Sequence, residues 1–160
     1  MLRIRPAVVH DARLLRTMIR ELAEFERQLE LVTISEEDLI HDGFGENPQF
    51  RALIAEWKEQ TAGYALFFGY YSTWVGRGLY LEDLFVREAF RGHGIGKALL
   101  AAVAQVAVAE GCRGMHWEVL EWNEKAIDLY KALGAEFQVE WRRVHLPGDA
   151  LMRLAEKTSS

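Results

Sequence analysis

Two adjacent carboxylates, Glu82 and Asp83, interrupt an apolar and aromatic stretch that runs from Leu79 to Val86. The stretch is typical of a strand buried on both faces, where an ionised carboxylate is unfavourable unless it is paired or takes part in chemistry. Because side chains alternate along a strand, we expect the two acids to point to opposite faces, unless a bulge changes the geometry. They are therefore candidates either for proton transfer and cation binding or for an ion pair with a neighbouring arginine.

A glycine-rich turn follows this strand and opens a helix. Glycines stand at positions 92, 94 and 96, and apolar residues then recur at helical spacing from Ile95 to Val106. Glycine lets the backbone approach a ligand closely, and the unpaired N–H groups at a helix start suit a phosphate or pyrophosphate. The turn is not a P-loop, since Ala98 follows Lys97 where Ser or Thr is required, and it lacks the third glycine of the dinucleotide fingerprint.

The pattern Arg-x-x-Gly-x-Gly after a strand resembles the acetyl-CoA pyrophosphate loop of the GNAT superfamily of N-acetyltransferases. The resemblance implies that backbone amides of the turn hold the pyrophosphate, and that the preceding strand pairs with the pantetheine arm like an added strand. A second segment, from Trp122 to Ala135, is also similar to this family. The acetyl-CoA-binding residues implied by the resemblance are Leu84, Phe85, Val86, Arg91, Gly92, His93, Gly94, Ile95, Gly96, Lys97, Asn123, Ala126 and Tyr130.

Further segments make the chain similar to the spermidine/spermine (diamine) and thialysine N-acetyltransferases of this family. They are Arg20–Glu26, Asp42–Gly45, Ser72–Trp74 and Leu81–Asp83. The resemblance implies transfer of an acetyl group to a primary amine, with Tyr130 as general acid for the departing thiolate and Glu82 as proton acceptor, directly or through water. Aromatic rings beside carboxylates suit an alkylammonium group, and the suggested substrate-binding residues are Phe25, Glu26, Trp74, Glu82, Asp83, His116, Trp117 and Glu118.

Several alternatives stay open at this point. Taken without the resemblance, Tyr130 is more typical of an aromatic residue packed in a helix core than of a catalytic acid. Ser72 stands where spermine-acetylating members carry an acid, and only Glu136 and Glu140 precede Trp141, so a short diamine or a lysine-like amino acid such as thialysine is as good an acceptor as a long polyamine. The competing functions are a non-catalytic acyl-CoA-binding module and a protein or peptide N-acetyltransferase.

Composition indicates a globular protein. The chain has 160 residues, half of them hydrophobic, and a net charge of −5 at pH 7, which fits one domain over residues 1–160. The negative charge argues against nucleic-acid binding, and the acids between Glu21 and Glu46 form either a solvated helix face or a region that attracts cations. With no membrane span, no signal peptide and one cysteine (Cys112), we expect a cytoplasmic protein. No histidines stand at metal-ligand spacing, so we expect no metal site. The resemblance implies a homodimer.

An α/β fold is needed to hold these residues. The expected order is strand, two helices, three strands, helix, strand, helix and two strands, which implies a mixed, mostly antiparallel sheet with helices on both faces. By resemblance, the sheet splays between its fourth and fifth strands, and acetyl-CoA enters the gap. The expected helices begin after Asp11, at Ser35, in the glycine turn and at Asn123. Asp11 and Asn123 are candidate N-caps, and Ser35 with Asp38 three residues on is a loose capping-box pattern. The expected strands cover residues 2–6, 50–57, 63–71, 79–86, 115–120, 137–144 and 150–154.

Overall fold

The computed structural model describes residues 1–157 of the chain. They fall into two compact units, one of Met1–Leu120 and a second that begins at Glu121, and each unit is considered by itself. No helix within the described part is both long enough and apolar enough to cross a membrane. The single domain expected over residues 1–160 stays a prediction.

A five-stranded sheet forms the centre of the first unit. Each of β1 (Leu2–Pro6), β2 (Arg51–Trp57), β3 (Gln60–Ser72) and β4 (Gly76–Val86) runs antiparallel to the next, and β5 (Met115–His116) is parallel to β4. β5 is shorter than predicted and pairs with β4 only through Leu79 and Tyr80. From Leu81 to Val86 no strand of the described residues pairs with this edge of β4, which we call its free edge. This confirms the predicted mixed sheet that opens between its fourth and fifth strands.

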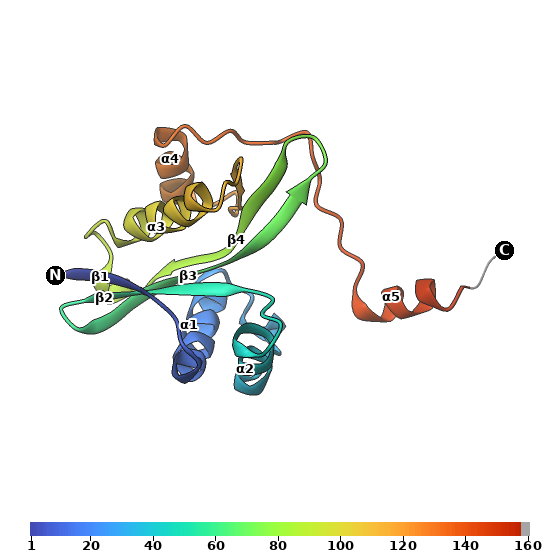
Figure 1. Cartoon of the computed structure of the whole chain (residues 1–160), viewed down its shortest axis with the longest axis horizontal. Helices are drawn as coiled ribbons and strands as arrows, with labels where there is room; N and C mark the ends of the chain where they lie inside the picture. Colours follow the sequence, from blue (N-terminus) through green and yellow to red (C-terminus); the bar gives the residue numbers. More distant parts are fainter. Residues whose placement is uncertain (158–160) are drawn as a thin grey trace. The chain divides into compact units, whose positions relative to one another are not determined.

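Helices cover both faces of this sheet (Figure 1). On one face lie α1 (Ala12–Phe25) and α2 (Glu36–Phe44), and on the other lies α3 (Ile95–Ala109). Short 3-10 turns at Val9–Asp11, Leu29–Leu31 and Glu88–Phe90 connect these elements. The arrangement agrees with the predicted layers.

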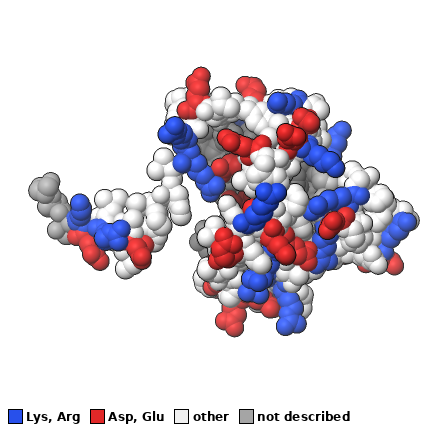
Figure 2. Space-filling model, turned by 180° about the vertical axis from the view of Figure 1, so that it is seen from behind, with Lys and Arg blue, Asp and Glu red and all other residues white. Residues whose placement is uncertain are grey.

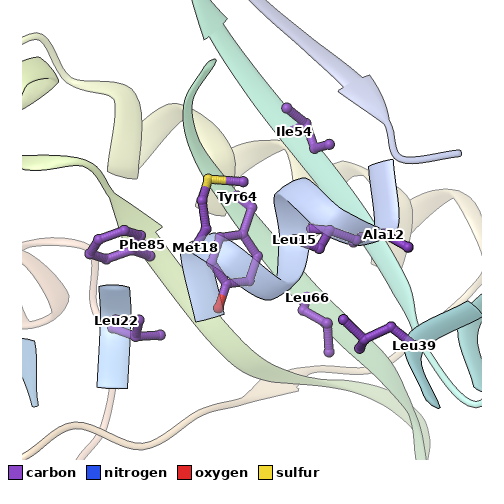
Figure 3. Packing of buried hydrophobic residues seen from close by; sticks show 10 residues of the cluster. Ala12, Leu15, Met18, Leu22, Leu39, Ile54, Tyr64, Leu66 and Phe85 are labelled. Carbon is purple, nitrogen blue, oxygen red and sulfur yellow. The ribbon is translucent and has the colours of Figure 1, made fainter. Parts of the chain in front are cut away.

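Between the sheet and α1 lies the main apolar core (Figure 3). β3 contributes alternate residues such as Tyr64 and Leu66, whereas α1 contributes residues at helical spacing such as Leu15 and Met18. Each element therefore buries one face, as its own periodicity requires. The cluster comprises Ala12, Leu15, Met18, Leu22, Leu39, Ala52, Ile54, Tyr64, Leu66 and Phe85.

Asp11 stands at the start of α1, but its side chain does not cap the helix as predicted. Its carboxylate accepts hydrogen bonds from the two terminal nitrogens of Arg5, at 2.8 and 3.0 Å, and from the backbone N–H of Val8 at 2.8 Å. Asp11 therefore ties β1 to the helix start. The predicted capping box of α2 is confirmed, because Asp38 N–H donates to Ser35 Oγ and Ser35 N–H donates to the Asp38 carboxylate.

In the second unit, α4 (Glu124–Ala132) begins where the sequence predicts a helix. Asn123 caps it, since its side-chain oxygen accepts the backbone N–H of Ala126 at 3.4 Å. Tyr130 lies on this helix and is buried. The unit therefore holds the three predicted acetyl-CoA-binding residues that follow position 120.

The two strands predicted near the C-terminus are wrong. Over residues 137–144 the backbone makes local turns, in which Val139 N–H donates to Phe137 and Trp141 N–H donates to Gln138. The second segment, 150–154, lies inside helix α5 (Gly148–Ala155). Its Ala, Leu, Met and Arg residues are strong helix formers, and this propensity outweighs the strand pattern in so short a stretch.

Candidate active site

A β-bulge in β4 positions the two adjacent carboxylates. Asp83 pairs with Leu66 of β3 and Leu81 pairs with Phe67, so Glu82 is an extra residue without a partner across the ladder. Because Leu66 belongs to the core under α1, its partner Asp83 faces α1 as well. The bulge interrupts the strict alternation of side chains at this point.

Glu26 follows the last residue of α1 and forms, with Glu82 and Asp83, what we call the acidic cluster. Burial raises the pKa of Asp83 to about 6; a hydrogen bond from Tyr64 opposes the rise, and the charges of Glu82 and Glu26 add to it. Burial also raises the pKa of Glu26, and the charge of Glu82 is the second cause. Glu82 is therefore close enough to both acids for its charge to act on them. The expectation that Glu82 and Asp83 point to opposite faces excepted a bulge, and β4 has one here, so strict alternation does not apply to this pair.

The acidic cluster has no basic partner among the described residues. On the face shown in Figure 2, lysine and arginine side chains are interspersed with acidic ones, and several arginines of the first unit form ion pairs, such as Arg51 with Glu110 at 2.6 Å. No such pair involves the acidic cluster in residues 1–157, and no group of three or more His, Cys, Asp or Glu side chains there is arranged to hold a metal. The ion pair that the sequence left open as an alternative for Glu82 and Asp83 is therefore not formed.

Asp83 is held instead by a tyrosine from the core. The hydroxyl of Tyr64 donates to Asp83 Oδ2 at 2.8 Å, and Tyr64 is completely buried. Sequence reasoning missed this residue. The available signal was a phenol at an inward position of a strand whose neighbouring inward residues are apolar, since a buried hydroxyl requires a partner.

The free edge of β4 exposes its backbone groups. Arg87 N–H donates to Ala62 O at 2.8 Å, so the adjacent pair of Gly63 and Val86 does not exchange hydrogen bonds across the ladder. Because bonded and non-bonded pairs alternate in an antiparallel ladder, the N–H and C=O groups of Leu84 and Val86 point away from β3. The Val86 carbonyl accepts a hydrogen bond from Arg91, and the other three groups can pair with an extended ligand that carries amides.

Arg91 connects this edge with the end of α1. Its Nε–H donates to the Val86 carbonyl at 3.0 Å, and its guanidinium carbon lies 4.8 Å from the ring centre of Phe25 and 5.9 Å from that of Phe85. One predicted cofactor residue and one predicted substrate residue, Arg91 and Phe25, therefore lie in contact. Arg87 adds a second link, since it donates to Glu21 of α1 at 2.9 Å.

The glycine turn leads into α3 as predicted. Gly92 and Gly94 have φ angles of 88° and 75°, which favour glycine, and Gly94 is the N-cap of the helix. A Cβ atom built on either glycine meets no atom within 4 Å, so the space beside the turn is open. His93, between them, stacks on Trp57 with ring centres 4.7 Å apart. An anionic group can thus approach the free N–H groups of the first turn of α3.

The remaining predicted substrate residues of the first unit lie in other places. His116 stacks on Tyr70 with ring centres 4.8 Å apart, Glu118 accepts the Tyr80 hydroxyl at 2.5 Å, and Trp117 between them is half-buried. Trp74 is 86% exposed at the tip of the β3–β4 hairpin. At 3.3 Å per residue along β4, this tip lies roughly 20 Å from the bulge, so within the first unit Trp74 stands apart from the acidic cluster.

Comparison with known proteins identifies the family. The pattern of the acetyltransferase (GNAT) family matches residues 15–135. Thialysine N-epsilon-acetyltransferase of Sus scrofa is 45% identical over 165 residues, which cover 96% of this chain and 97% of that protein. Human spermidine/spermine N(1)-acetyltransferase-like protein 1 is 39% identical over 82% of this chain and 20% of its own length.

The fold of the chain is also similar to that of a solved protein. A solved integron cassette protein from the mobile metagenome of V. cholerae has a TM-score of 0.79 and 25% identity, with 98% of both chains covered. The chain therefore belongs to the acetyltransferase (GNAT) family, and it is an N-acetyltransferase.

Proposed function

We propose that this enzyme transfers the acetyl group of acetyl-CoA to a primary amine of a small cationic acceptor, either a diamine or polyamine or a thialysine-like amino acid. The acidic cluster carries the proposal, because three carboxylates gather near the bulge of β4 and the end of α1 without a basic partner among the described residues. Such a cluster favours an acceptor with more than one positive charge. Relatives named as thialysine and spermidine/spermine acetyltransferases support the same class of acceptor.

In the proposed reaction, the neutral amine nitrogen attacks the thioester carbonyl and the carbon–sulfur bond then breaks. The acceptor ammonium first loses a proton to Glu82, directly or through water. After attack, the nitrogen loses its second proton, the departing thiolate takes a proton from the Tyr130 hydroxyl, and the second proton restores that hydroxyl through solvent. Glu82 is exposed at the bulge, so solvent and an incoming amine can reach it. Asp83 and Glu26 hold the remaining positive charge of the acceptor.

We assign acetyl-CoA to the glycine turn and the free edge of β4. The outward peptide groups of Leu84 and Val86 suit the amides of the pantetheine arm, and the open space beside Gly92 and Gly94 suits the pyrophosphate. Asn123, Ala126 and Tyr130 of α4 complete the proposed set. The homodimer and the cytoplasmic location expected from the sequence remain predictions, and sedimentation of the full chain tests the first.

The experiment that tests the acceptor class measures thiol release from acetyl-CoA against putrescine, spermidine, spermine, thialysine, lysine and a basic peptide. We expect saturable turnover with at least one small diamine or thialysine and none with the peptide, which serves as the control for charge alone. Turnover on the peptide only would assign the enzyme to protein acetylation. Tight CoA binding with no turnover on any amine would instead favour the non-catalytic module.

A further inference from the structure

We infer that Tyr64 is a positioning residue: from inside the core, its hydroxyl holds the Asp83 carboxylate ionised and directed into the acidic cluster, where it binds the second positive charge of the acceptor. The inference rests on the proposed function and deepens it. It assigns a role to a residue buried in the core under α1, which the sequence did not single out.

Packing around the ring of Tyr64 fixes the direction of its hydroxyl. The ring is completely buried in the core cluster with Met18 and Leu22 of α1 (Figure 3). It meets the ring of Phe85, its ladder partner, edge to face with centres 6.3 Å apart. Held in this way, the hydroxyl reaches Asp83 Oδ2 at 2.8 Å. A side chain packed this closely cannot follow a moving carboxylate, so it fixes the carboxylate instead.

The charges around Asp83 make this donor necessary. Burial disfavours the ionised form most, and the charges of Glu82 in β4 and of Glu26, just after α1, disfavour it further. The arginines at the end of β4 are already engaged, Arg87 with Glu21 and Arg91 with a backbone carbonyl. Burial also raises the pKa of Tyr64 well above 10, so its hydroxyl keeps its proton and remains a donor. Tyr64 is thus the group in contact with Asp83 that favours the carboxylate.

The test replaces Tyr64 with phenylalanine and measures kcat/KM for the preferred small amine from pH 5.5 to 9. Losing a hydrogen bond to a charged acceptor raises the pKa of that acceptor by on the order of one pH unit. The fall of kcat/KM on the acid side of the profile should therefore lie about one pH unit higher in the variant. The variant is then roughly fivefold less active than wild type at pH 6 and within about twofold at pH 8.5. Deprotonation of the amine itself is the same in both proteins, so the ratio of their activities isolates the protein group.

Two controls separate positioning from general loosening of the core. Ile54→Val removes a methyl group from the residue that pairs with Tyr64 on β2 and is equally buried; its activity ratio to wild type should not change with pH. In an Asp83→Asn background, Tyr64→Phe should cause no further loss, because its partner charge is gone. A pH-independent ratio for Tyr64→Phe, or a full further loss in the Asp83→Asn background, would overturn the inference.

A measurement without turnover distinguishes this inference from the proposed function. The pKa of Asp83, followed by NMR of its side-chain carboxyl carbon, should rise in Tyr64→Phe and stay unchanged in Ile54→Val. If wild type acetylates no small amine, the proposed acceptor class fails, yet this comparison still decides whether Tyr64 holds the carboxylate. No rise in the pKa of Asp83 would reject the role of Tyr64 even in an active enzyme.

Discussion

Replacing Gly94 with alanine tests the backbone contribution of the glycine turn to acetyl-CoA binding. Gly94 has a φ of 75°, in the left-handed region, and a Cβ added there meets no atom within 4 Å. The substitution therefore introduces backbone strain without a steric clash. A loss of affinity then reports the strained turn together with the methyl group that enters the space assigned to the pyrophosphate, and a loss of unfolding free energy reports the strain alone.

The size of the effect follows from the cost of that conformation. A left-handed backbone costs an L-residue about 1–2 kcal/mol, which corresponds to a factor of about 5 to 30 in an equilibrium constant. If the free turn relaxes, this factor appears as weaker acetyl-CoA binding. If the turn stays strained, the same 1–2 kcal/mol is lost from the free energy of unfolding.

Gly96→Ala is the matched control. It lies two residues further on, within the first turn of α3, has no positive φ, and its added Cβ would lie at an ordinary 3.6 Å from Val86 Cγ2. We expect it to leave affinity unchanged, because alanine favours a helix. Calorimetric titration with CoA and urea unfolding of both variants give the two quantities. If Gly94→Ala changes neither, or if Gly96→Ala weakens binding equally, the strained turn does not organise the site.

Three further predictions concern Tyr130, Asp11 and Gly63. Tyr130→Phe should lower turnover by about 10² with CoA affinity within about twofold, whereas the exposed Tyr71→Phe should change neither; unchanged turnover would remove Tyr130 from the mechanism. Asp11→Asn should lower the free energy of unfolding by about 2–3 kcal/mol at pH 7. Hydrogen bonding from Arg5 lowers the pKa of Asp11 below its ordinary value of 3.8. This stability is therefore present above about pH 4 and is lost as the pH falls through the pKa of the folded state. The difference in unfolding free energy between wild type and variant, measured with urea, should shrink at low pH, and a constant difference would contradict the pairing. Gly63→Ala places a Cβ 2.2 Å from the carbonyl oxygen of Phe85, so thermal unfolding should show a loss of about 1–3 kcal/mol, whereas Gly114→Ala, with open space around it, should show little.

Local patterns predicted much of the first unit. The capping box at Ser35, the cap at Asn123 and the helix after the glycine turn depend on residues close in sequence, and all three are found where they were expected. The sheet order and its opening followed from the resemblance and from strand patterns. The pairing partner of each strand residue did not, because register depends on contacts between segments far apart in the chain.

The predictions that failed depended, like the register, on partners outside the local sequence pattern. Nothing in Leu81–Asp83 itself shows that its register with β3 shifts by one residue here, so the bulge at Glu82 could not be read from the sequence. Asp11 has the residue type of a helix cap, yet Arg5 offers its carboxylate a stronger, charged donor. Over residues 137–144 strand propensity was present, but a strand also needs a neighbouring strand to accept its hydrogen bonds.

The bulge at Glu82 also restricts how this strand can change over evolutionary time. Leu81 on one side of it and Phe85 on the other both pack into the interior, and the extra residue between them keeps each in phase with its own layer. A single deletion at this point would restore strict alternation and turn every following side chain over. Point substitutions can therefore alter the charge of the site, whereas insertions and deletions here must come as compensated pairs, and the length of this segment should vary less among relatives than its composition.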